Sequence, residues 1–149
     1  TERVVSGLGI SNIYDYLREM SRVPEVPAVA ARMEGAEDRT PIIVEAAVKG
    51  ESPVCVAALD LFVDALGAEA SNMALKVLST GGLYLGGGIP PRILEVLEHG
   101  PFMESFLDKG RMREVLEPMP VLVIMEPGAA LMGAASYGLL MGEQEDPAG

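Results

Sequence analysis

The chain has a single cysteine, Cys55, and a single histidine, His99, among its 149 residues. One cysteine cannot build an intramolecular disulfide framework, and the two residues together cannot supply a zinc site made of cysteine and histidine. Basic residues are also few, because 11 lysines and arginines stand against 22 acidic residues, for a formal net charge of −11. A chain so acidic lacks the basic surface that binds nucleic acid or an anionic membrane. We therefore expect no metal site, no nucleic-acid partner and no membrane partner.

Long apolar runs are missing as well. The longest stretch without charge, residues 127–142, is 16 residues long, short of the roughly 18 that a membrane-spanning helix needs. No signal peptide is visible at the start, where Glu2 and Arg3 interrupt any apolar run. With 49% hydrophobic and 22% charged residues, the chain can still bury the core of one domain. These features predict a soluble, acidic, cytoplasmic domain, and the start at a patterned Thr1 suggests a piece of a longer protein.

Local signals predict that the amino-terminal half is almost entirely helical. Apolar residues at helical spacing follow Ser11, and a serine or threonine precedes proline at positions 40–41 and 52–53. Such pairs combine a capping residue with proline at the first helical position. Helices are therefore expected at residues 11–20, 40–49 and 53–78, the last buried on most faces, with one further turn near 29–33 in the connection 22–39.

The other half predicts two short strands and a closing helix. Leu83–Leu85 is a short apolar run bounded by glycines, and residues 120–125 are rich in β-branched side chains. Helical segments separate the two strands, so they are expected to pair in parallel through a right-handed crossover. Residues 129–141 are expected to form a helix whose small residues allow close packing. The fold class predicted is α/β, with helix predominating.

A run of three glycines after the first strand is the main candidate for a ligand site. Gly86, Gly87 and Gly88 lead into a helix, which places backbone N–H groups at the carboxyl edge of the sheet. Without Cβ atoms, a phosphate or a flat ring can approach the backbone, but a tight turn that needs positive φ explains the glycines equally well. A second loop, residues 6–12, resembles a Gly-x-Gly loop before a helix, and a plain helix entry is its alternative.

Three single residues are further candidates. Glu2 could accept two hydrogen bonds from neighbouring sugar hydroxyls, although a solvated surface glutamate explains it as well. His99 stands before Gly100-Pro101, where a cation at a helix end is expected rather than a catalyst. Cys55 falls within the long apolar helix and is expected to be a small buried hydrophobe.

Five segments, in order along the chain, resemble the carboxyl-terminal half of bacterial glucokinase, in the actin/hexokinase/heat-shock ATPase superfamily. Leu8 and Glu126 depart from the pattern, since many relatives have proline at the first position and asparagine at the second. The matching segments are residues 2–10 with Asn12 and Tyr14, then 81–92, 106–111, 120–121 and 127–133.

The resemblance implies both a fold and an activity. It implies that residues 1–142 are a helix-rich lobe of the ribonuclease-H-like fold, with the parallel strand pair present and three antiparallel strands missing. The tail at 143–149 is polar and lacks periodicity, so it is expected to fray. The activity implied is ATP-dependent phosphorylation of the 6-hydroxyl of glucose, with Mg²⁺. Glu2 would then bind the sugar, and the turn formed by residues 86–88 would belong to the adenosine-binding motif.

The resemblance also implies what this chain does not contain. In that family the catalytic aspartate, a phosphate-binding glycine loop and a second sugar motif lie upstream of the matching half. We therefore expect no catalytic residue here and no turnover by the chain alone. The open edge of the strand pair is expected to be covered, either by a neighbouring chain in a homodimer or by the chain's own first residues. Two alternatives remain: a non-catalytic sugar-responsive regulator of the repressor/kinase family, or a structural dimerisation domain.

Overall fold

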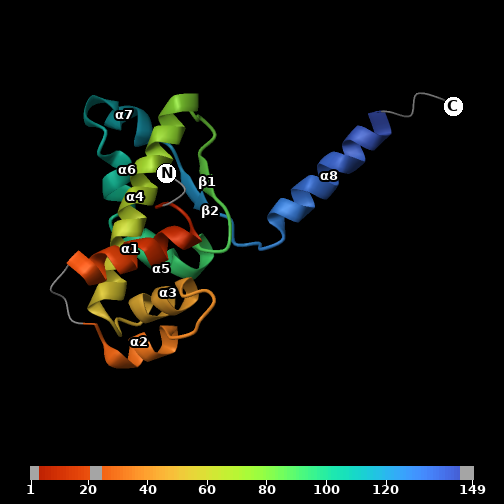
Figure 1. Ribbon diagram of the computed structural model, residues 1–149. Helices are drawn as coiled ribbons and strands as arrows, with labels where there is room; N and C mark the ends of the chain where they lie inside the picture. The colour runs from red at the N-terminus through yellow and green to blue at the C-terminus, as the bar shows by residue number, and fades with distance from the viewer. Residues whose placement is uncertain (1–3, 21–24, 145–149) are drawn as a thin grey trace.

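The computed structural model describes residues 4–20 and 25–144 (Figure 1). The helix-rich α/β fold predicted from the sequence is confirmed, with a parallel pair of strands beside a body of helices. The elements are α1 (Gly7–Met20), α2 (Pro27–Met33), α3 (Thr40–Val48), α4 (Pro53–Val77), β1 (Leu83–Leu85), the 3-10 helix η1 (Pro90–Ile93), α5 (Leu94–His99), α6 (Phe102–Leu107), the 3-10 helix η2 (Gly110–Met112), α7 (Arg113–Leu116), β2 (Val121–Val123) and α8 (Ala129–Gln144).

Helix α4 forms the centre of the body. Ser52 caps it by accepting a hydrogen bond from the backbone N–H of Cys55, and Pro53 occupies its first position. Helices α1, α3 and α6 pack around α4, so its buried residues recur on several sides, as the apolar sequence predicts. Helix α6 leaves no room for a side chain at Gly67, where an added Cβ would lie 2.4 Å from the carbonyl oxygen of Phe102.

Helix α1 begins four residues before the position predicted from Ser11. Its start is set by Ser6, whose side chain accepts a hydrogen bond of 3.2 Å from the backbone N–H of Gly9. Ser11 instead lies buried inside the helix and faces α3. The apolar stripe therefore predicts the helix correctly, but the predicted start at Ser11 is wrong, because Ser6 marks the start.

The two strands pair in parallel, as predicted, with Tyr84 opposite Leu122 in the centre of the register. Strand β2 is shorter than the apolar run 120–125, because the register pairs residues 121–123 with β1. Pro120 and Ile124 each add one backbone hydrogen bond to β1, to Leu83 and Leu85. One face of the pair packs on the core through Leu85, whereas Tyr84 and Leu122 are exposed on the other. In the described residues the sheet has these two strands and no more.

Helix α8 extends away from the rest of the molecule (Figure 1). Its side chains from 130 to 141 are all exposed, including Leu131, Tyr137 and Leu139. A helix that is apolar all round ordinarily lies in an interior, so this surface is suited to contact with another polypeptide. None of the described helices is long and apolar enough to cross a membrane. The tail predicted from residue 143 begins inside α8, and residues 145–149 lie outside the described residues.

Candidate functional site

A cleft of about 1020 Å³ opens where three segments meet, and we call it the glycine cleft. The first segment is the entry to α1, residues 6–12. The second is α3 with the residues just before and after it, 38–49, and the third is residues 88–92, which follow the glycine run. Both glycine-containing loops singled out in the sequence therefore line one site, although about 80 residues separate them. A Cβ added at Gly7 would lie 3.8 Å from the Cδ1 atom of Ile89, so the two loops are in contact.

The three consecutive glycines do not have the same structural role. Gly87 has a φ of +105°, a conformation that side chains rarely adopt, so the tight-turn explanation accounts for it. Gly86 and Gly88 have no such backbone. A Cβ at Gly86 would make ordinary contact with Ile124 at 3.5 Å, and one at Gly88 would meet no described atom within 4 Å. Gly88 therefore stands on the cleft wall without a local backbone reason for being glycine.

The walls of the glycine cleft are mainly apolar, with charged groups on them. Leu8, Val44 and Ile89 belong to the apolar part. Lys49 is already paired with Glu45, whose pKa is held below its usual range by the hydrogen bond from that lysine. Arg92 forms no ion pair with any described residue.

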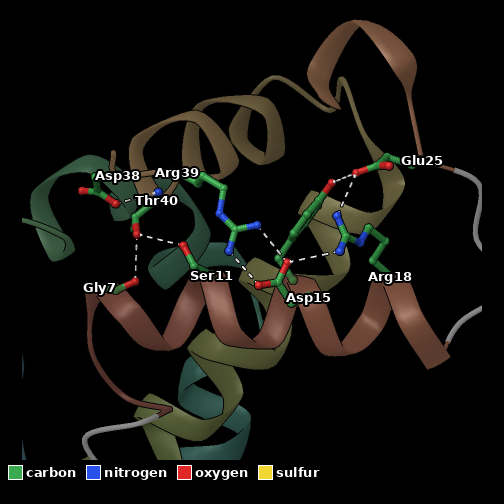
Figure 2. A network of polar contacts seen from close by, with 9 residues as sticks. Gly7, Ser11, Asp15, Arg18, Glu25, Asp38, Arg39 and Thr40 are labelled. Carbon is green, nitrogen blue, oxygen red and sulfur yellow. Dashed lines mark hydrogen bonds and ion pairs between the residues drawn. The ribbon is translucent and has the colours of Figure 1, made fainter. Parts of the chain in front are cut away.

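Polar bonds join α1 to α3 beside the cleft (Figure 2). The hydroxyl of Thr40 donates to the carbonyl oxygen of Gly7 at 2.9 Å, and its Oγ1 lies 3.2 Å from the Oγ of Ser11. The backbone N–H of Thr40 donates to a carboxylate oxygen of Asp38 at 2.9 Å. Thr40 is the first residue of α3 and not its cap: the cap position is Arg39, which makes no side-chain cap hydrogen bond, and the Thr40 hydroxyl binds α1 instead.

A second group of polar residues joins the same two helices farther along. Arg39 binds Asp15 through two hydrogen bonds, and the pKa of Asp15 is lowered chiefly by this contact. Arg18 lies 3.9 Å from Asp15 and 4.0 Å from Glu25. Tyr14, fully buried, donates to Glu25, and burial followed by this hydrogen bond raises the pKa of its phenol. None of these residues lines the cleft.

The other candidates from the sequence lie away from the cleft or outside the described residues. Glu2 is outside them, so its expected role in sugar binding stays a prediction. His99 is the last residue of α5, with Nδ1 3.1 Å from the carbonyl oxygen of Glu95, which confirms its place at a helix end. Cys55 is fully buried, and burial raises the pKa of its thiol.

Sequence reasoning missed the contribution of α3. Asp38, Thr40 and Pro41 line the cleft, yet in the sequence they show only a turn and a helix start. No pattern along the chain indicates that the start of α3 lies against the start of α1, some 30 residues earlier. The sequence signal that does mark the site is the pair of glycine loops.

The glucokinase family model matches residues 1–141. The chain belongs to the glucokinase family. A glucokinase from Trichormus variabilis is 43% identical over 144 residues, which are 90% of this chain and 42% of that protein. One from Neisseria gonorrhoeae is 40% identical over 135 residues, or 91% of this chain and 38% of that protein.

A solved structure supports the same relationship. The crystal structure of glucokinase from an Antarctic psychrotroph superposes with a TM-score of 0.73 at 34% identity, covering 91% of this chain and 39% of that chain. The family resemblance noted in the five sequence segments is thereby confirmed. The chain spans about two fifths of the length of the relatives it matches.

Proposed function

We propose that the full protein carrying this chain transfers the γ-phosphoryl group of ATP to the 6-hydroxyl of glucose. We propose further that the glycine cleft receives the nucleotide, with residues 86–88 beside the adenosine. The observation that supports this most directly is Gly88, a cleft-wall glycine that neither backbone conformation nor crowding requires. A missing side chain at such a place leaves room for a ligand to approach the backbone.

The composition of the cleft suits a nucleotide. The apolar wall, which includes Val44 and Ile89, offers a surface for a flat base. Arg92 is a cation without an ion-pair partner among the described residues, in a chain whose net charge is −11. Mg²⁺ would accompany the phosphates of the nucleotide, whose oxygens are ligands that it prefers.

The sugar site and the rest of the fold belong to the same proposal. Glu2 would accept hydrogen bonds from glucose hydroxyls. The strand pair would be part of a ribonuclease-H-like lobe, completed by three antiparallel strands. Phosphoryl transfer depends on groups from both lobes closing around the substrates. We therefore propose that this chain alone does not catalyse the reaction. We also propose that the protein acts in the cytoplasm.

The test is hexose-dependent ADP release by the purified full protein, with glucose, mannose, fructose and N-acetylglucosamine measured in parallel. Turnover strongest with glucose supports the proposal, and the 149-residue chain assayed alone should release no ADP above a no-protein control. An absence of turnover with every sugar, with sugar binding retained, would instead indicate the non-catalytic regulator.

A homodimer is proposed as the assembly. The exposed Tyr84 and Leu122 on the strand pair and the apolar α8 leave surface that a second copy could cover. A purely structural dimerisation domain would present the same surfaces. That alternative function predicts that the glycine cleft does not bind ATP.

A further inference from the structure

We infer that Thr40 is a positioning residue, whose hydroxyl holds the two walls of the glycine cleft at the separation that nucleotide binding requires. The inference rests on the proposed function, because it concerns the same cleft. Thr40 is 7% exposed and is contributed by α3, whereas its partners Gly7 and Ser11 are contributed by α1.

The donor and the acceptor can be assigned in each hydrogen bond of the Thr40 hydroxyl. A threonine hydroxyl has one proton, and that of Thr40 goes to the carbonyl oxygen of Gly7 at 2.9 Å. Ser11 must therefore be the donor in its 3.2 Å contact with Thr40. Both hydroxyls are buried, so the loss of the Thr40 oxygen would leave Ser11 without this acceptor and Gly7 without this donor.

The bonded groups are also parts of the cleft wall. Gly7 and Leu8 line it from the α1 side, and Thr40 and Pro41 line it from the α3 side. The bond from Thr40 to Gly7 therefore spans the junction between two walls that are 33 residues apart in the sequence. If this bond is removed, the loop at residues 6–8 can move relative to α3, and the shape of the cleft changes.

Contacts other than those of Thr40 also hold α1 and α3 in place. The two hydrogen bonds between Asp15 and Arg39 join the same helices away from the cleft. Helices α1 and α3 also both pack against α4. Removing the hydroxyl should therefore alter the cleft while α1 and α3 stay packed.

The experiment compares Thr40→Val with Thr40→Ser in the full protein. Valine keeps the shape of threonine and removes the oxygen, whereas serine keeps the oxygen. We expect Thr40→Val to raise the KM for ATP about tenfold, equivalent to about 1.4 kcal/mol, because the displaced loop changes the shape of the cleft, with the KM for glucose little changed. The Tm should fall, because the buried hydroxyl of Ser11 loses its acceptor. Thr40→Ser should stay close to the wild type. The matched control is Thr80→Val, at an exposed threonine outside the cleft.

The outcomes distinguish the inference from the proposed function. Calorimetric titration with ATP is run on the wild type, Thr40→Val and Thr40→Ala, which also removes the bond to Gly7 and keeps the test open if the valine variant does not fold. Equal ATP affinity in the wild type and the variants overturns the inference and leaves the proposed function standing. The inference is also overturned if the KM values for ATP and for glucose rise together, and by the same factor, in Thr40→Ser and Thr40→Val. A full-length wild type that neither binds nor hydrolyses ATP overturns the proposed function, and the inference with it.

Discussion

Arg39 binds both carboxylate oxygens of Asp15, with N–O distances of 2.9 and 2.6 Å (Figure 2). A planar guanidinium matches a carboxylate in this two-bond arrangement, which fixes orientation as well as distance. The pair joins α1 to the residue just before α3, 24 positions away. Both side chains are about one-third exposed, so solvent weakens the attraction, and the pair contributes more to alignment than to stability.

We expect Asp15→Asn to lower the free energy of unfolding by about 1 kcal/mol at neutral pH, the upper range for a partly exposed pair. The Arg39 contact lowers the pKa of Asp15 in the folded protein. The stabilisation is therefore present above the unfolded pKa, near 3.9, and is lost as the pH falls through the lower folded value. Urea unfolding of both proteins at pH 7 and at pH 3 measures the difference, which should shrink at the lower pH.

The control for this substitution is Glu19→Gln, which removes an exposed carboxylate on the same helix that forms no ion pair with a described residue. It should have little effect at either pH. A difference between wild type and Asp15→Asn that is the same at both pH values would show that the Asp15–Arg39 pair is not the source.

The glycine run predicts two different responses to alanine. Gly87→Ala should destabilise the protein by about 1–2 kcal/mol, because its φ of +105° is strained for any side chain. Gly88→Ala should leave the Tm unchanged, since the added methyl group enters open space. In the full protein, however, Gly88→Ala should raise the KM for ATP. Unchanged ATP kinetics in Gly88→Ala would argue against a nucleotide beside this glycine.

The packing of α4 against α6 predicts a second contrast between glycines. Gly67→Ala would place Cβ 2.4 Å from the carbonyl oxygen of Phe102, and neither backbone can yield without separating the helices. We expect a loss of about 2 kcal/mol by urea unfolding, a typical cost of overpacking. Gly133→Ala, within the exposed α8, meets no described atom within 4 Å and should cost nothing. Equal effects of the two substitutions would contradict this account of the packing.

The exposed apolar surface of α8 predicts self-association of the chain. Light scattering after size-exclusion chromatography, over a concentration series, should show a dimer. The double substitution Leu131→Glu and Leu139→Glu should shift it to monomer, because both leucines are more than 70% exposed and a dimer would bury them. Leu61→Glu, at an exposed leucine on α4, is the matched control. A wild-type chain that is monomeric throughout would rule out the proposed homodimer.

Most of the fold was predictable because its signals are local. The serine and proline before α4, its apolar faces and the β-branched run of β2 can all be recognised within a few residues, and the parallel pairing followed from the helical crossover. The predicted start of α1 was wrong because Ser6 and Ser11 both precede apolar positions. Capping is decided by which serine reaches a free N–H, here that of Gly9.

The element types, the acidic charge and the glycine loops can all be read from the sequence, and the resemblance to glucokinase indicates the family. Tertiary structure alone decided that residues 6–12, α3 and residues 88–92 surround one cleft. It also decided that the hydroxyl of Thr40 binds Gly7 rather than capping its own helix. The physical reason is that a pattern along the chain shows which face of an element is buried. Which distant element lies against that face depends on how all of them pack together.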